Sequence, residues 1–143
     1  MRGGLFLLSP KAASKSQKEI KMRILNIEDD AIKHNDICKV IKSCGSMKID
    51  WARNLESGVD KIREGIQGGT PYDLVITDMW YPREPGGEDE ESGAALIQLI
   101  QQEKWELPVI LCSSVRYRIP GILGAIHYSK NENWEDELKK LIK

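Results

Sequence analysis

Short apolar runs alternate with segments of helical periodicity from residue 22 onward, and this alternation constrains the fold more than any other feature. Strands that alternate with helices are typical of β-α units, which build a parallel sheet covered by helices on both faces. The sequence therefore predicts a five-stranded, doubly wound α/β domain. The predicted strands are 23–27, 47–51, 74–77, 109–112 and 126–129.

The segments between these runs carry apolar residues on one helical face. In the first, Ile37, Val40, Ile41 and Cys44 recur at helical spacing, and Gly45 follows at the usual capping position. Such spacing predicts an amphipathic helix packed on the sheet. Comparable segments begin at Asn54, Ser92 and Trp134.

The connection between the fourth and fifth strands departs from this pattern. Pro120 stands where a full helix would be expected, and proline inside a helix removes a hydrogen-bond donor and clashes with the preceding turn. We therefore expect the fourth helix to be short or irregular.

Length and charge limit the domain organisation and the partners. The 143 residues have 41% hydrophobic and 30% charged side chains, which suits one compact domain, expected over 22–143. The net charge is −1, so nucleic-acid binding is disfavoured. Residues 1–21 are expected to form a flexible tail, whose apolar run is too short for a signal peptide or a membrane span.

The number and spacing of the cysteines indicate the redox environment of the protein. Cys38, Cys44 and Cys112 are odd in number and include no C-x-x-C pair. Each lies in or beside an apolar run, which favours buried, reduced thiols. We therefore expect a cytoplasmic protein.

Polar residues follow the predicted strands, where ligands of open parallel sheets bind. Glu28 and Asp29 follow the first strand, Asp78 the third, Ser113 the fourth and Lys130 the fifth. Converging carboxylates repel unless a hard cation such as magnesium lies among them. Lysine and serine suit phosphoryl oxygens, so the residues indicate phosphoryl transfer to a carboxylate.

Four segments resemble the signature segments of response-regulator receiver domains, and the resemblance runs from about residue 22 to the end. They are 24–30 (ILNIEDD), 77–82 (TDMWYP), 109–114 (VILCSS) and 128–130 (YSK). The resemblance implies a flavodoxin-like sheet in the order 2-1-3-4-5. No glycine-rich phosphate loop or dinucleotide fingerprint follows a strand, so nucleotide hydrolysis and dinucleotide binding are disfavoured.

The resemblance also implies a role for each site residue. Asp78 would be the phosphoacceptor, and Mg²⁺ would be held by Glu28, Asp29, Asp78 and the backbone carbonyl of Trp80. By the same resemblance, Ser113 would hydrogen-bond the phosphoryl group.

Lys130 is implied to pair with the phosphoryl group. Family members receive this group from a histidine kinase, a phosphotransfer protein or a small donor such as acetyl phosphate. Such a domain would catalyse at most its own phosphorylation and dephosphorylation. It would act on an output protein that the sequence does not identify.

Three features depart from the family. The loop 83–91 is longer than usual and acidic, and it could be a solvated insertion or a partner-specific surface. Asn131 stands where family members usually have a proline after the lysine. The resemblance implies that signalling uses a shift of the fourth strand and helix and an aromatic residue on the fifth strand. The segment 124–130 is one residue shorter than usual, so either His127 or Tyr128 could be this aromatic switch residue. Because the fourth helix is also expected to be short, the output surface is expected to differ from the usual one.

Two other functions remain open. A pseudo-receiver would keep the fold but bind a protein without phosphorylation. An aspartate-nucleophile phosphatase would need an acid two residues after Asp78, where Trp80 stands instead. Of the two histidines, His34 is expected to be a surface helix residue.

Overall fold

The protein is described by a computed structural model that covers residues 19–143. The tail predicted for 1–21 lies outside the described residues except for residues 19–21. In that short part, the Lys21 backbone N–H donates to the Ser46 carbonyl, 2.7 Å away. The chain thus joins the domain just before its first strand.

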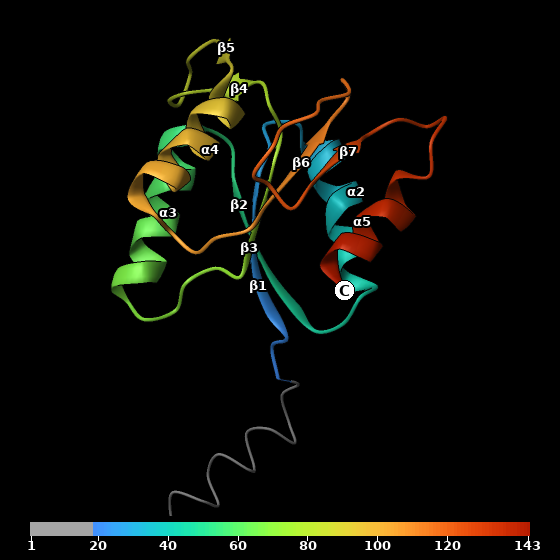
Figure 1. Cartoon of the computed structure of the whole chain (residues 1–143), viewed down its shortest axis with the longest axis horizontal. Coiled ribbons are helices and arrows are strands. Elements are labelled where there is room, and N and C mark those ends of the chain that lie inside the picture. The colour runs from blue at the N-terminus through green and yellow to red at the C-terminus, as the bar shows by residue number, and fades with distance from the viewer. Residues whose placement is uncertain (1–18) are drawn as a thin grey trace, which may run out of the picture.

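Five parallel strands form one sheet in the order β2-β1-β3-β6-β7, shown in Figure 1. Counted among the parallel strands alone, this is the order 2-1-3-4-5, so the predicted flavodoxin-like topology is confirmed. The strands are β1 (Met22–Ile27), β2 (Met47–Ala52), β3 (Leu74–Thr77), β6 (Val109–Ser113) and β7 (Gly124–His127).

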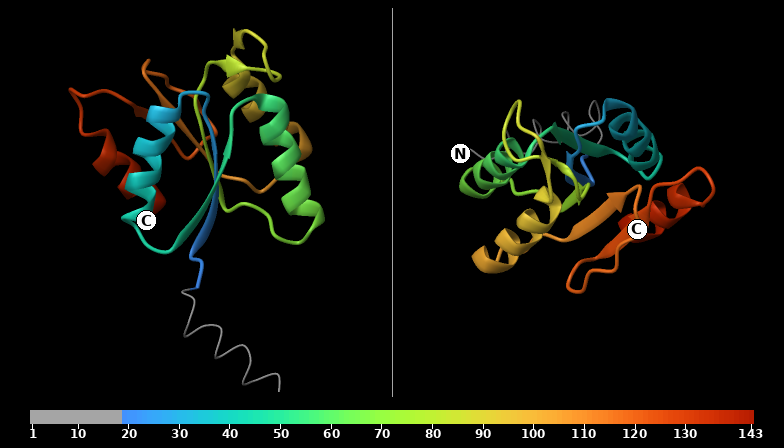
Figure 2. Two further views of the ribbon diagram at one scale, coloured as in Figure 1. Left: turned by 180° about the vertical axis from the view of Figure 1, so that it is seen from behind. Right: turned by 90° about the horizontal axis from the view of Figure 1, so that it is seen from above.

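Helices cover both faces of the sheet, as predicted. Figure 2, seen from above, shows α2 and α5 on one face and α3 and α4 on the other. No helix within residues 19–143 is long and apolar enough to cross a membrane. The helices are α2 (Ala31–Lys42), α3 (Leu55–Gln67), α4 (Ser92–Glu103) and α5 (Trp134–Ile142).

The two faces of the sheet bury separate apolar clusters. Side chains of successive strand residues point to opposite faces, and in β1 Ile24 belongs to the cluster under α2 and α5. Its neighbours Leu25 and Ile27 belong to the cluster under α3 and α4. All four residues of β3 are buried, as expected for a central strand. The sheet is therefore packed on both faces, and it fixes the positions of the residues that directly follow its strands.

His34 is buried, so the prediction of a surface residue was wrong. It is 8% exposed, and its Nδ1 lies 2.7 Å from Oδ1 of the buried Asn26. Its ring stacks on Trp51, with the centroids 4.2 Å apart. Because an unpaired amide in the core would be costly, the imidazole satisfies the side chain that β1 directs toward α2.

The last strand begins and ends two residues earlier than predicted. Pairing with β6 starts at Gly124, opposite Ile110. A Cβ at Gly124 would lie 2.5 Å from a methyl carbon of Leu141, so the close packing of α5 favours glycine there. Glycine carries no strand signal, which is why the apolar pattern missed this end. As a consequence, Lys130 lies three residues beyond the strand.

The segment between β6 and β7 contains turns and bends but no helix, in agreement with the predicted irregular fourth helix. Ile119 and Ile122 pack against the cluster under α3 and α4. Val115 and Leu123 remain about half exposed. The segment 114–123 is thus attached through a few apolar contacts and single hydrogen bonds, such as that from the Leu123 N–H to the Val109 carbonyl, rather than through a helical face.

Gly93 links the start of α4 to the turn after β3. A Cβ at this position would lie 2.3 Å from the Asp78 carbonyl oxygen and 2.8 Å from the Met79 Cα. We predict that Gly93→Ala lowers the free energy of unfolding by about 1–3 kcal/mol, as overpacking does. Urea denaturation would measure it. The exposed Ala94→Ser change, in the same helical turn, is the control; an equal effect of both would contradict the close contact.

Candidate functional site

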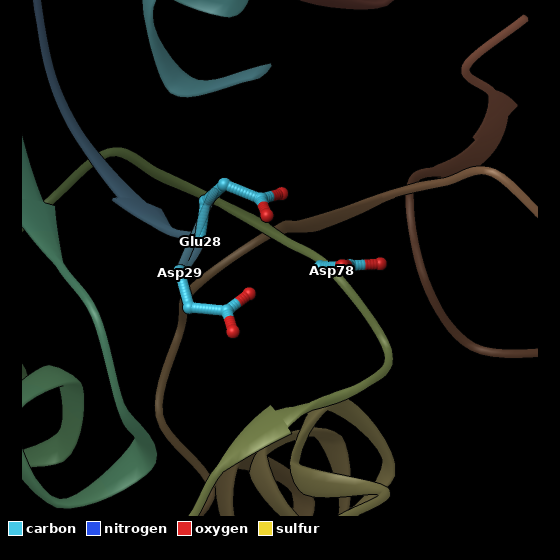
Figure 3. A group of neighbouring side chains, drawn as sticks. All are labelled: Glu28, Asp29 and Asp78. Carbon is cyan, nitrogen blue, oxygen red and sulfur yellow. The ribbon is translucent and has the colours of Figure 1, made fainter. Parts of the chain in front are cut away.

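Three carboxylates converge at the carboxyl ends of β1 and β3. Glu28 and Asp29 directly follow β1, Asp78 directly follows β3, and one carboxylate oxygen of each lies within 4.8 Å of the other two. Figure 3 shows Glu28 and Asp29 projecting from the end of β1 toward the side where Asp78 lies. Because Ile27 is paired with Thr77, the two strands end side by side. The predicted grouping of these three residues is therefore found.

A lysine that the sequence analysis missed completes this group. Lys33 lies in the first turn of α2 and is 5% exposed. Its Nζ is 2.9 Å from Glu28 Oε1 and 3.3 Å from Asp78 Oδ1. It also donates to the Cys112 carbonyl oxygen at 2.7 Å. The acidic site thus contains a buried ammonium supplied by the chain itself.

A sequence signal for Lys33 does exist. The apolar face of the first helix includes Ile37 and Ile41, and stepping back by four residues from Ile37 reaches Lys33. Stepping back by three reaches His34, which is also buried. Polar residues on the inward face of a helix, within one turn of a strand end, therefore indicate side chains that are directed toward the site.

Burial dominates the electrostatics of this group. It raises the pKa of Glu28 to about 7; the Lys33 ammonium opposes the shift and Asp78 adds to it. Burial by itself would lower the pKa of Lys33, but the Glu28 and Asp78 carboxylates outweigh it and the pKa is raised. When all three carboxylates are ionised, the one ammonium leaves two negative charges to be neutralised.

The acidic loop forms a short hairpin beside the site. Strand β4 (Tyr81–Pro82) pairs antiparallel with β5 (Asp89–Glu90), near the start of α4 in Figure 1. Tyr81 is fully buried and its hydroxyl lies 2.9 Å from the Thr77 hydroxyl oxygen. The pKa of Asp29 is raised by burial and next by the charge of Asp89. The loop therefore places an additional negative charge near the site.

Side chains at the end of β2 also stabilise the turn after β1. The Trp51 indole N–H donates to the Glu28 carbonyl oxygen at 2.7 Å. Arg53 donates to the Asp29 carbonyl oxygen at 3.0 Å and lies over the Trp51 ring. These contacts fix the backbone of both acids, so their side chains are positioned before any ligand binds.

Ser113 is the last residue of β6, and Trp80 lies three residues after the end of β3. Ser113 is 3% exposed at the end of β6, and its hydroxyl oxygen accepts from the Val115 backbone N–H. Trp80 is 45% exposed, and its indole N–H donates to the Tyr117 hydroxyl at 2.9 Å. The roles of the Ser113 hydroxyl and the Trp80 carbonyl stay predictions.

Lys130 is not brought to the three carboxylates by any contact in the described part of the chain. It is exposed in the turn after β7, and no ion pair or hydrogen bond of its ammonium is found within residues 19–143. It lines an open groove beside α2 and α5. Its predicted pairing with a phosphoryl group remains a prediction.

His127 and Tyr128, the two possible switch residues, have different surroundings. His127 Nε2 lies 2.9 Å from the Ser114 carbonyl oxygen, and Nδ1 contacts Glu132. The Tyr128 hydroxyl donates to Asp36 at 2.6 Å. His127 therefore contacts the irregular segment after β6, whereas Tyr128 contacts α2.

The donor set fits a magnesium ion. All three acidic side chains offer oxygen, the ligand atom that Mg²⁺ prefers. Glu28 Oε1 is buried and makes no hydrogen bond of good geometry, although the Lys33 ammonium lies close to it. A divalent cation would also neutralise the two remaining charges. Glu28, Asp29 and Asp78 are the residues that would hold it.

Comparison with known proteins agrees with this fold. No family model matches the chain. Histidine protein kinase 1 from Candida albicans is 29% identical over 98 residues, which are 68% of this chain but 4% of the kinase. The chain thus corresponds to a small part of that relative's length.

Solved receiver domains and response regulators share the fold. The response regulator TrrA from Thermotoga maritima, in complex with Mg²⁺-BeF, has a TM-score of 0.62 and 25% identity, covering 84% of this chain and 98% of that one. The HemR receiver domain from Leptospira biflexa also has a TM-score of 0.62, with 20% identity over 86% of this chain and 95% of its own.

The five-stranded sheet and its helices have the fold that these solved receiver domains share, and the three carboxylates lie at the strand ends of that fold. The chain has the fold of a response-regulator receiver domain, and this fold indicates two-component signalling.

We predict that magnesium binding weakens as the pH falls through about 7, the pKa of Glu28. Below this pH Glu28 carries a proton that a metal must displace, so the affinity should fall by up to about tenfold per pH unit. Calorimetric titration with MgCl₂ between about pH 6 and 8 would measure it. Glu28→Gln should bind more weakly and show a flatter profile. A native affinity independent of pH would contradict this assignment.

We also predict that Asp89→Asn weakens magnesium binding by about two- to fivefold, because it removes a negative charge near Asp29. The same titration at low ionic strength measures the effect. Glu84→Gln, an equal change of charge in the same hairpin loop, is the matched control. If both variants weaken binding equally, the effect comes from net charge and the hairpin has no specific contribution.

Proposed function

We propose that this chain is the phosphoacceptor domain of a two-component system, in which Asp78 receives a phosphoryl group with the help of Mg²⁺. The observation that supports it most is the convergence of Glu28, Asp29 and Asp78 at two neighbouring strand ends. The receiver-domain likeness includes one response regulator solved with Mg²⁺-BeF. Together these favour transfer onto a carboxylate over other reactions of an acidic site.

The acceptor carboxylate is held by the backbone. Asp78 Oδ1 accepts a hydrogen bond from the Met79 N–H at 2.7 Å, and the Asp78 N–H donates to the Ile27 carbonyl at 3.1 Å. These bonds leave Asp78 partly exposed, with 17% of its side chain accessible. A bound magnesium ion would neutralise the charge that develops on the phosphoryl oxygens.

The proposed phosphodonor is a histidine kinase or a phosphotransfer protein, and acetyl phosphate can serve as a small donor. Similarity to part of a histidine protein kinase supports this assignment. At most, the domain would catalyse its own phosphorylation and dephosphorylation. We further propose a cytoplasmic location, supported by the three free cysteines.

The output partner is proposed to be another protein that contacts the segment 114–123. The hydrogen bond from Trp80 to Tyr117 connects the turn after Asp78 directly to this segment. Because the segment lacks a helix, the surface it presents differs from a helical output face. The near balance of 21 basic and 22 acidic residues disfavours a nucleic-acid target.

A second candidate function is a pseudo-receiver that binds a protein without being phosphorylated. The ion pairs of Lys33 favour it, because they already compensate part of the acidic charge without a metal. The irregular segment 114–123 would then be a fixed binding surface. Phosphorylation of Asp78 separates the two functions.

We predict that beryllofluoride changes the tryptophan fluorescence of the native chain only when magnesium is present, and that acetyl phosphate adds one phosphoryl group by intact mass. Trp80 lies two residues from Asp78 and should report binding. Asp78→Asn should abolish both signals, because an amide cannot accept the group. Asp60→Asn, at an exposed position of α3, is the matched control.

Failure of the well-folded native chain to respond at millimolar magnesium would support the pseudo-receiver instead. A response that persists in Asp78→Asn would show that another residue is the acceptor.

A further inference from the structure

Lys33 occupies a position from which an ammonium can reach the reacting group. Its Nζ lies 3.3 Å from Asp78 Oδ1, on a side chain with 7% of its surface accessible. Within residues 19–143, no other lysine or arginine forms an ion pair with Asp78. The fixed positive charge nearest to the acceptor therefore comes from α2.

Several contacts fix the Lys33 ammonium in this place. It donates to the Cys112 carbonyl oxygen at 2.7 Å, lies 2.9 Å from Glu28 Oε1, and is 5.5 Å from the centre of the Tyr128 ring. A charge held in this way needs little rearrangement when negative charge develops nearby. By contrast, Lys130 would have to leave an exposed turn.

We propose that Lys33, rather than Lys130, is the catalytic lysine that pairs with the phosphoryl group on Asp78. This inference rests on the proposed phosphoacceptor function. With acetyl phosphate as donor, a bond forms between an Asp78 carboxylate oxygen and phosphorus. The bond from phosphorus to the acetyl oxygen breaks, and acetate leaves with the electron pair. Lys33 remains protonated and stabilises the phosphoryl oxygens.

The same geometry makes Lys33 a competitor of the metal. Glu28 and Asp78 are shared between the ammonium and any magnesium ion at the three carboxylates. Where Glu28 is ionised, removing the ammonium should therefore strengthen magnesium binding and weaken binding of the phosphoryl group. A lysine with only a structural role would produce no such opposite changes.

The test is a beryllofluoride titration at saturating magnesium, in which tryptophan fluorescence measures binding. Lys33→Met should weaken beryllofluoride binding by about tenfold to a hundredfold, as expected for loss of a charge-assisted hydrogen bond. Its magnesium affinity, measured separately by calorimetry at alkaline pH, where Glu28 is ionised, should rise by several-fold. Lys39→Met, at an exposed position of the same helix, is the matched control and should change neither affinity.

A second measurement uses the unmodified protein, because Lys33→Met could also destabilise the fold. In a ¹⁵N-labelled chain at low temperature, the buried Lys33 ammonium should give a slowly exchanging signal. This signal should shift when beryllofluoride is added in the presence of magnesium. A Lys33 signal that does not change on binding would overturn the proposal.

The other outcomes also decide the question. If Lys130→Met weakens beryllofluoride binding and Lys33→Met does not, the phosphoryl group pairs with Lys130 and the proposal is wrong. If both affinities of Lys33→Met stay at the native values, Lys33 has only a structural role. If the folded native chain binds no beryllofluoride, the proposed function itself fails, and this inference fails with it.

Discussion

Repulsion among Glu28, Asp29 and Asp78 is the constraint on which the rest of the site depends. The parallel pairing of β1 with β3 brings their ends together, so three carboxylates must share one small region. The chain compensates part of this charge with Lys33. The two negative charges that remain are what a divalent cation can balance. In the proposed function, metal binding and phosphoryl transfer are therefore linked through the same few atoms.

The surrounding elements hold this charged group in place. Trp51 and Arg53 at the end of β2 bind the backbone of the acidic turn, and Gly93 allows α4 to begin directly against Asp78. In the turn after β3, Trp80 contacts Tyr117 of the segment that follows β6. A change at Asp78 thus has a direct physical connection to a surface where a partner could bind.

Sequence patterns were sufficient for the sheet and for the three carboxylates. Buried strands such as β3 are continuous apolar runs, and acids that directly follow two of the strands must converge once the sheet is parallel. Lys33 and His34 were missed because a polar residue on an inward helical face looks solvated until its partner is known. Their partners, Glu28 and Asn26, come from β1.

The remaining differences arise from packing that no local pattern reveals. Gly124 lies in β7 opposite Ile110, where the close packing of Leu141 favours glycine, and glycine and alanine carry no strand signal. This shifts Lys130 away from the strand end on which its predicted role depended. The hairpin of β4 and β5 begins at the buried Tyr81, and the acidic residues that follow gave no strand signal.

The most direct test of the account is to locate the phosphoryl group chemically. After reaction with acetyl phosphate and magnesium, borohydride reduction converts an aspartyl phosphate to homoserine, which peptide mass spectrometry can place in the sequence. The account predicts homoserine at position 78 and at no other acidic residue. Homoserine at Asp29 or Asp89, or none at all in a folded chain that has bound magnesium, would contradict it.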